Sequence, residues 1–243
     1  MSVYEKMTAL ADAIRSKTGG TEKLTIDQMT ADVSALQVDD GSFKGVIERT
    51  AANPILPSDL ISIGDHAFYW NTTLVLPVLP SGLTSIGRYA FSSCSNLALT
   101  SLPKGVISIG SQTFYNCSNL ALTSLPEGLT RIPDYGFFGC SNLALTSLPE
   151  GLTSIGEYAF SGCSNLALTE LPSGLTSIDM SAFYNCKKIT KITFEGTPTT
   201  ISSSAFSNCT NLTAINVPWA EGAVANAPWG ATKATINYNY TGG

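Results

Sequence analysis

The residue types that most often perform chemistry in proteins occur here with a spacing that argues against catalysis. The sequence has 243 residues, with six cysteines and one histidine. A zinc site needs cysteines two to four residues apart, usually with histidine, and six cysteines could also form a disulfide framework. The cysteines instead recur every 23 residues, at Cys94, Cys117, Cys140, Cys163, Cys186 and Cys209. This spacing predicts a row of buried thiols that pack as small hydrophobic groups, with a disulfide between neighbouring repeats as the alternative.

The remaining candidates for catalysis follow the same repeat. A Ser-His-Asp or Cys-His site would have to use His66, the only histidine. Other repeats carry unrelated residues at this place, such as Tyr89 and Ser181, so we interpret it as a replaceable surface position. Glu127 and Glu150 could be the paired carboxylates of a glycosidase, but their spacing makes them neighbours in one exposed row. The glycines belong to turns rather than to a phosphate-binding loop. We therefore expect no catalytic residues, no metal and no cofactor.

The same period governs the apolar residues and predicts the architecture. Phenylalanine recurs every 23 residues, at Phe68, Phe91, Phe114, Phe137, Phe160, Phe183 and Phe206. An isoleucine stands five residues before each phenylalanine, and leucines follow at constant distances. One repeat cannot bury such residues alone, so successive coils must stack on one another. We predict a solenoid that is mainly β, with a short strand at Leu-Thr-Ser-Ile-Gly. A turn at Leu-Pro-x-Gly-Leu ends an earlier strand, and a helical or 3₁₀ turn surrounds each phenylalanine.

The pattern Leu-Pro-x-Gly-Leu-Thr-Ser-Ile-Gly-x-Tyr-Ala-Phe-x-x-Cys resembles the BspA-type leucine-rich repeat of bacterial surface and gut-associated proteins. The resemblance covers residues 45 to 218 and implies a leucine-rich repeat solenoid. One departure is that the family places an apolar residue where Thr146 stands, whereas here Leu145 comes one position earlier. Either this row (Leu99, Leu122, Leu145 and Leu168) points outward, or the strand bulges and turns it inward. We favour the bulge, because a row of exposed leucines invites aggregation.

The two ends of the chain differ from the repeat. Residues 1–40 carry two apolar stripes at helical spacing, separated by Gly19-Gly20, which predict an α-helical hairpin. This hairpin would cap the solenoid of residues 41–218, which we expect to have about seven coils. Its alternative role is attachment or homo-oligomerisation. Residues 219–243 read as a C-terminal cap that ends in an edge strand.

Short segments at both ends resemble prophage-encoded tail-associated proteins of gut Firmicutes. The segments concerned are Ala9–Arg15 and Leu24–Met29 at one end, and Val217–Trp219 and Ala227–Ala231 at the other. This resemblance implies a protein that is part of a phage tail. It is less specific than the resemblance of the repeat, because the segments are short.

Composition narrows the classes of partner. The net charge is -5 and no cluster of Lys and Arg is present, which argues against nucleic acid. No apolar run is long enough to insert into a membrane. The first residues have neither the basic nor the apolar region of a secretory signal, so we expect no export signal in this sequence.

Candidate binding residues are the aromatic side chains beside the phenylalanine row. Some directly follow it (Tyr69, Tyr115, Phe138 and Tyr184), and others stand two residues before it (Tyr89, Tyr135 and Tyr158). Aligned rings could stack on sugars or anchor a protein partner; alternatively they cover the turns of neighbouring coils. A polar row (Ser101, Ser124, Ser147 and Glu170) is a second candidate surface or a solvated face. The repeated asparagines (Asn96, Asn119, Asn142, Asn165 and Asn211) are predicted to form a buried row that satisfies backbone groups.

These observations lead to three hypotheses on function. The first is a non-catalytic module, resembling prophage tail-associated proteins, that presents a rigid surface to a host glycan or protein. The second is a bacterial cell-surface adhesin of the BspA-like kind, and the third is an enzyme. The first two place the protein on a virion or on a cell surface.

Overall fold

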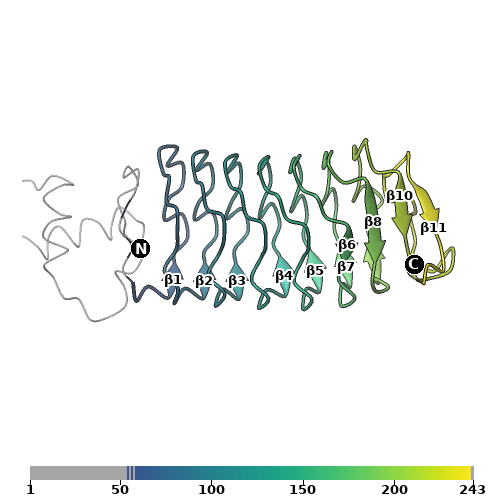
Figure 1. The fold of residues 1–243 in the computed structure, drawn as a ribbon, viewed down its shortest axis with the longest axis horizontal. Coiled ribbons are helices and arrows are strands. Elements are labelled where there is room, and N and C mark those ends of the chain that lie inside the picture. Colours follow the sequence, from purple (N-terminus) through teal and green to yellow (C-terminus); the bar gives the residue numbers. More distant parts are fainter. Residues whose placement is uncertain (1–53, 55, 57, 242–243) are drawn as a thin grey trace, which may run out of the picture. The chain divides into compact units, whose positions relative to one another are not determined.

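The structure, a computed structural model, describes residues 54, 56 and 58–241 of the chain. Within that part the chain winds into about eight coils of about 23 residues, each lying beside the previous one (Figure 1). The coils form a parallel β-solenoid, which confirms the predicted architecture. The helical hairpin predicted for residues 1–40 lies outside the described residues.

Short parallel strands recur at the same place in successive coils, because a Ser-Ile pair or a close equivalent returns in each repeat. In each pair the isoleucine is buried and the residue before it is exposed or half-buried. The strands are β1 (Ser62–Ile63), β2 (Ser85–Ile86), β3 (Ser108–Ile109), β4 (Arg131–Ile132), β5 (Ser154–Ile155), β6 (Glu170–Leu171), β7 (Ser177–Ile178), β8 (Lys191–Phe194), β9 (Thr200–Ile201), β10 (Ala214–Asn216) and β11 (Thr235–Asn237).

The described strands form three sheets, in the orders β1-β2-β3, β4-β5-β7-β9 and β6-β8-β10-β11. The strands of the first two sheets lie at the same position of the coil, but the pairing between coils is interrupted between β3 and β4. Elsewhere the N–H after the isoleucine donates to the isoleucine carbonyl of the preceding coil, as Gly110 does to Ile86 at 2.9 Å. Pro133 stands at this place after β4 and has no N–H, so it cannot donate to the carbonyl of Ile109. The proline therefore accounts for the break in the sheet.

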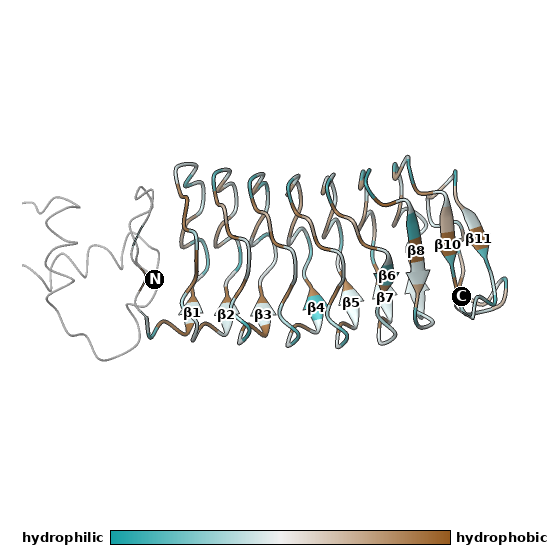
Figure 2. Ribbon diagram, in the orientation of Figure 1, coloured by the Kyte–Doolittle hydropathy of each residue, from teal (hydrophilic) through white to brown (hydrophobic). Residues whose placement is uncertain are grey.

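The core is built from like residues stacked on one another. All seven phenylalanines of the row are fully buried, and neighbouring rings lie parallel with centroids 5.1 to 5.6 Å apart. Rows of leucine and isoleucine flank them, and Figure 2 shows apolar stretches returning at the same place in successive coils. The predicted interior rows are confirmed. Because each residue contacts its equivalents in the adjacent coils, the core is continuous through the described coils.

The segment around each phenylalanine is a chain of turns with alternating hydrogen bonds. The Phe91 N–H donates to the Thr113 carbonyl of the next coil at 2.9 Å, whereas the Cys94 N–H donates within its own coil to the Phe91 carbonyl at 3.0 Å. In the first six coils, the residues two before and two after the phenylalanine have left-handed backbone, as at Tyr89 (φ 56°) and Ser93 (φ 62°). This alternation joins adjacent coils and prevents a continuous 3₁₀ helix.

The row of Leu99, Leu122, Leu145 and Leu168 points inward, as the bulge hypothesis required. The next two residues in the chain, such as Thr100 and Ser101, are both exposed, and Leu102 is buried again. Two consecutive outward residues break the two-residue period of a strand. Contrary to expectation, the described part has no strand at this place before β6, which has the same outward pair but lies beside the regular strand β8 and pairs with it. Regular alternation returns in β8, where Ile192 and Phe194 are buried.

The parallel pairing continues beyond the last regular repeat. β11 pairs in register with β10, with Ile236 opposite Ile215, and lies at the end of its sheet. The indole rings of Trp219 and Trp229 are buried beside Phe194, with centroids 5.2 and 6.1 Å from it. Two large rings thus fill the core where the phenylalanine row ends.

Candidate binding surface

The fold places the candidate aromatic residues on the outside of the turn segment. Each phenylalanine of the row turns inward. Two neighbouring positions lie on the opposite side of the backbone, namely the residue that follows the phenylalanine and the left-handed residue two places before it. The seven predicted rings are exposed or half-buried. They form two clusters and one separate residue.

The first aromatic cluster consists of His66, Tyr69, Trp70 and Tyr89. The His66 and Tyr89 rings stack at 4.8 Å with an interplanar angle of 13°. Tyr69 meets both edge-on, at 5.6 and 6.2 Å, and also contacts Trp70 at 6.3 Å. Trp70 is 65% exposed. The prediction that His66 lies at the surface is confirmed, but its ring is part of an aromatic group that the sequence did not reveal.

The second aromatic cluster consists of Tyr115, Tyr135, Phe138 and Tyr158. Tyr115 stacks on Phe138 at 4.8 Å, and Tyr135 stacks on Tyr158 at 5.0 Å. Two tilted contacts and one edge-on contact, with centroids 5.9 to 6.5 Å apart, join the two stacks. Stacked rings cover each other's faces and present mainly their edges to solvent. The rings therefore cover one another between coils, and they leave an aromatic edge accessible.

Polar groups border both clusters. The Gln112 side-chain amide donates to the Tyr89 hydroxyl at 2.7 Å, which links the first cluster to the third coil. The Tyr135 hydroxyl lies 3.5 Å from a Glu157 carboxylate oxygen. Desolvation, followed by the negative charge of Glu157, raises the pKa of Tyr135. The phenol thus stays protonated and remains able to donate a hydrogen bond.

Tyr184 lies outside both clusters. It is exposed, and no ring contact joins it to another aromatic residue in the described part of the chain. The reason is that serines occupy the neighbouring aromatic positions, namely Ser161 in the preceding coil and Ser181 in its own.

The polar row of Ser101, Ser124, Ser147 and Glu170 is exposed throughout. Glu170 belongs to β6, where it pairs with Thr193 of β8, so this row leads into the sheet of β6, β8, β10 and β11. Among the described residues no hydrogen bond or ring contact joins it to the aromatic clusters. The two predicted surfaces are therefore separate.

The cysteines form the predicted structural row. All six are buried and none is in a disulfide. Each thiol donates to the carbonyl of the phenylalanine 26 residues earlier, for example Cys140 to Phe114 at 3.0 Å. Burial raises the pKa of Cys94 to about 12 and that of Cys209 to about 11, and raises the others well above the ordinary value of 9.0. The thiols stay protonated at neutral pH and are poor nucleophiles.

The prediction for the asparagine row is wrong. Asn96, Asn119, Asn142, Asn165 and Asn211 are exposed. Their side chains bond mainly to one another along the surface, as Asn119 does to Asn96 at 3.5 Å. The backbone groups nearby are already satisfied by coil-to-coil bonds, such as that from the Asn119 N–H to the Ser95 carbonyl. A buried amide is therefore not needed there.

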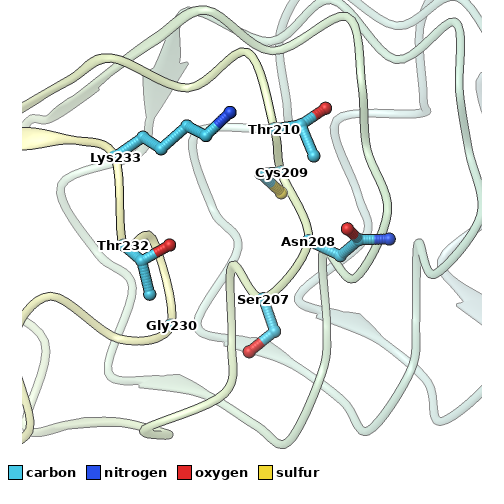
Figure 3. Close-up of a pocket in the computed structure, with 7 residues that line it drawn as sticks. All are labelled: Ser207, Asn208, Cys209, Thr210, Gly230, Thr232 and Lys233. Atoms are coloured by element: carbon cyan, nitrogen blue, oxygen red, sulfur yellow. The ribbon is translucent and has the colours of Figure 1, made fainter.

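A cavity of about 290 Å³ lies between the last two coils (Figure 3). Residues 207–210 line one side, while Gly230, Thr232 and Lys233 line the other. Its only thiol, Cys209, donates to the Phe183 carbonyl and has a raised pKa, so it cannot act as a nucleophile at neutral pH. His66 lies in the first described coil, far along the chain from this cavity.

The described residues contain no group of three or more His, Cys, Asp or Glu side chains placed to hold a metal ion. Over the same residues, no helix has the length and apolar character needed to cross a bilayer.

Sequence reasoning overlooked Trp70 and Gln112. The signal for Trp70 was visible, since the equivalent residues of all other coils are Ser, Asn or Gly. No signal pointed to Gln112, because its role depends on reaching a hydroxyl in the adjacent coil.

Comparison with solved structures identifies relatives of this fold. A leucine-rich repeat protein from T. pallidum matches with a TM-score of 0.57 and 28% identity, over 68% of this chain and 78% of that one. A leucine-rich cell surface protein from Faecalibacterium prausnitzii matches with a TM-score of 0.53 and 27% identity, over 67% of this chain and 53% of that one. A leucine-rich repeat protein from Eubacterium ventriosum matches with a TM-score of 0.52 and 27% identity, over 65% of this chain and 43% of that one. The chain thus spans about half of the F. prausnitzii protein.

No curated protein matches the sequence. A family model described as BspA type leucine-rich repeat region matches residues 36–147 and 130–221, which together cover most of the chain. The repeat pattern, the stacked coils and this match agree. The chain belongs to the BspA-type leucine-rich repeat family.

Proposed function

We propose that this chain is a non-catalytic recognition module that binds an external protein or glycan through its aromatic surface. The observation that carries the proposal is the presence of two aromatic clusters on the outside of the turn segments, held by a rigid stack of coils. Aromatic rings are the usual anchors of binding interfaces, because they contribute a large contact area at a small cost in conformational entropy. The solved relatives are leucine-rich repeat proteins, which supports a binding role.

The rigidity of the surface favours binding. In three pairs (His66 with Tyr89, Tyr115 with Phe138, and Tyr135 with Tyr158) a ring stacks on its equivalent one coil away, so its orientation is set before a partner arrives. The backbone beneath is fixed by coil-to-coil hydrogen bonds, such as that from the Tyr135 N–H to the Glu157 carbonyl at 2.8 Å. A preorganised surface loses little entropy on binding.

Two settings fit this role. We propose first that the module is part of a phage tail, which the short end segments support through their resemblance to tail-associated proteins. The alternative is display on a bacterial surface, which the F. prausnitzii cell surface protein supports. Antibody labelling of purified virions and of intact producer cells distinguishes the two settings.

The proposal is tested by binding of the purified chain to a glycan array and to intact gut bacterial cells. A Tyr135→Ala, Phe138→Ala double variant should weaken binding at least about tenfold, because two partly exposed anchors are removed. Ser124→Ala is the matched control in the separate polar row and should bind normally. Equal binding by all three proteins would contradict the proposal. Hydrolytic turnover that disappears in His66→Ala would contradict its non-catalytic part.

A further inference from the structure

Trp70 stands at a position that disfavours a large side chain. It is the second residue after Phe68 of the phenylalanine row, and its backbone is left-handed with φ 64°. The other coils place small or polar residues at this position, namely Ser93, Asn116, Gly139, Gly162, Asn185 and Asn208. Glycine and asparagine adopt left-handed backbone readily, whereas a bulky side chain there is strained.

The tryptophan gains little packing in return for this strain. Its side chain is 65% exposed, the largest exposure of any tryptophan in the chain, because Trp219 and Trp229 are buried. Its only ring contact within the described residues is with Tyr69, at 6.3 Å and an interplanar angle of 63°. A large side chain that is exposed, has left-handed backbone and makes one ring contact among the described residues points to a role in binding.

The geometry of Trp70 also differs from that of the stacked rings. Tyr135 and Tyr158 lie nearly parallel and cover each other's faces. Trp70 meets its neighbour Tyr69 at a steep angle, and no parallel ring from the described residues covers the indole faces. An open aromatic face is what the apolar C–H face of a pyranose ring requires for stacking.

Hydrogen-bond donors and acceptors lie in the coil of Trp70 and in the next coil. Asp65, His66 and Arg88 are exposed. The Asp65 carboxylate accepts a hydrogen bond from the backbone N–H of Arg88 at 2.6 Å. Among the described residues the only ion pair joins Arg131 and Asp134, so the Arg88 guanidinium is not neutralised by a carboxylate. The described part of these two coils carries two acids, Asp59 and Asp65, and one base, Arg88, so its net charge is small and negative. Polar groups with this charge suit the neutral hydroxyl groups of a sugar better than an anionic ligand.

We infer that Trp70, with Tyr69 and the polar groups of Asp65, His66 and Arg88, binds a pyranose unit of a neutral oligosaccharide. This inference rests on the proposed recognition function and assigns it a ligand class and a site. A sugar is favoured over a protein partner because the site offers one exposed indole ring with a few polar groups, whereas a stable protein interface buries about 800 Å² on each side.

The test uses fluorescence of the full chain, since Trp70 is its exposed tryptophan. Cellohexaose, mannohexaose and chitohexaose are the probes, and at least one should produce a saturable blue shift of the emission. Trp70→Asn should weaken binding of that probe at least tenfold. Asparagine occupies the same position in other coils, so this variant should melt at the wild-type temperature or above. Tyr184→Ala, which removes an aromatic ring outside both clusters, should bind normally.

The outcomes separate this inference from the function on which it rests. If no hexasaccharide shifts the emission while Trp70→Asn loses binding to cells, Trp70 contacts a ligand of another class and the assignment to a neutral oligosaccharide is overturned. If Trp70→Asn binds sugar and cells normally while the Tyr135, Phe138 double variant does not, the site is overturned and the proposed function stands. If neither variant affects binding to cells, both fail.

Discussion

Replacement of Phe137 by alanine tests whether the stacked phenylalanine row holds the coils together. The ring is fully buried and lies between Phe114 at 5.4 Å and Phe160 at 5.5 Å, nearly parallel to both. Removing a buried phenylalanine costs about 3–5 kcal/mol through lost burial and the cavity that remains. Each aromatic pair adds about 0.5–1.5 kcal/mol beyond its area. With two pairs broken, we expect a loss near the upper end, about 4–5 kcal/mol.

The adjacent residue is a matched control. Phe138 has the same side chain but is half-buried and stacks on one side, against Tyr115 at 4.8 Å. Phe138→Ala should therefore cost about 1–1.5 kcal/mol, mainly from that pair and its partial burial. The two variants should thus differ by at least about 2 kcal/mol, a large fraction of the 5–15 kcal/mol that stabilises a typical protein.

Urea unfolding followed by far-ultraviolet circular dichroism measures both variants. In a solenoid each coil depends on its neighbours, so Phe137→Ala should also reduce the cooperativity of the transition. Equal midpoints for the two variants, or a loss below about 1 kcal/mol for Phe137→Ala, would show that the row is not the principal core.

Two further predictions concern the thiol row and the glycines. The pKa of Cys94 is raised from 9.0 to about 12 and that of Cys209 to about 11, so above pH 9 the folded chain retains protons that the unfolded chain loses. Stability from these thiols is complete below pH 9 and should fall as pH rises towards 11–12; a urea midpoint that increases between pH 8 and 10.5 would contradict this. An alanine Cβ at Gly110 would lie 2.5 Å from the Arg88 backbone nitrogen, whereas one at the equivalent Gly64 would have no atom of the described residues within 4 Å. Thermal melting should show a loss of about 1–3 kcal/mol for Gly110→Ala and a change within about 0.5 kcal/mol for Gly64→Ala; equal effects would refute the close approach.

The sequence was sufficient to predict the rows of the interior. Phe137, Ile132 and Cys140 recur at one period, and an apolar residue repeated in every coil can be buried only by stacking on its equivalents. For Leu145 the sequence left two directions open, and the inward one was favoured because a row of exposed leucines invites aggregation. The family was also recognisable, because the period and the residue types agree together.

The tertiary structure decided the direction of the polar rows and the grouping of the rings. A period shows that Asn119 and Asn142 share a row, but only the course of the backbone decides whether that row faces inward or outward. The stacking of Tyr135 on Tyr158, the link from Gln112 to Tyr89 and the open face of Trp70 depend on left-handed residues and on distances between coils. Those distances arise only once the coils have stacked, because they join residues that are far apart in the chain and adjacent in space.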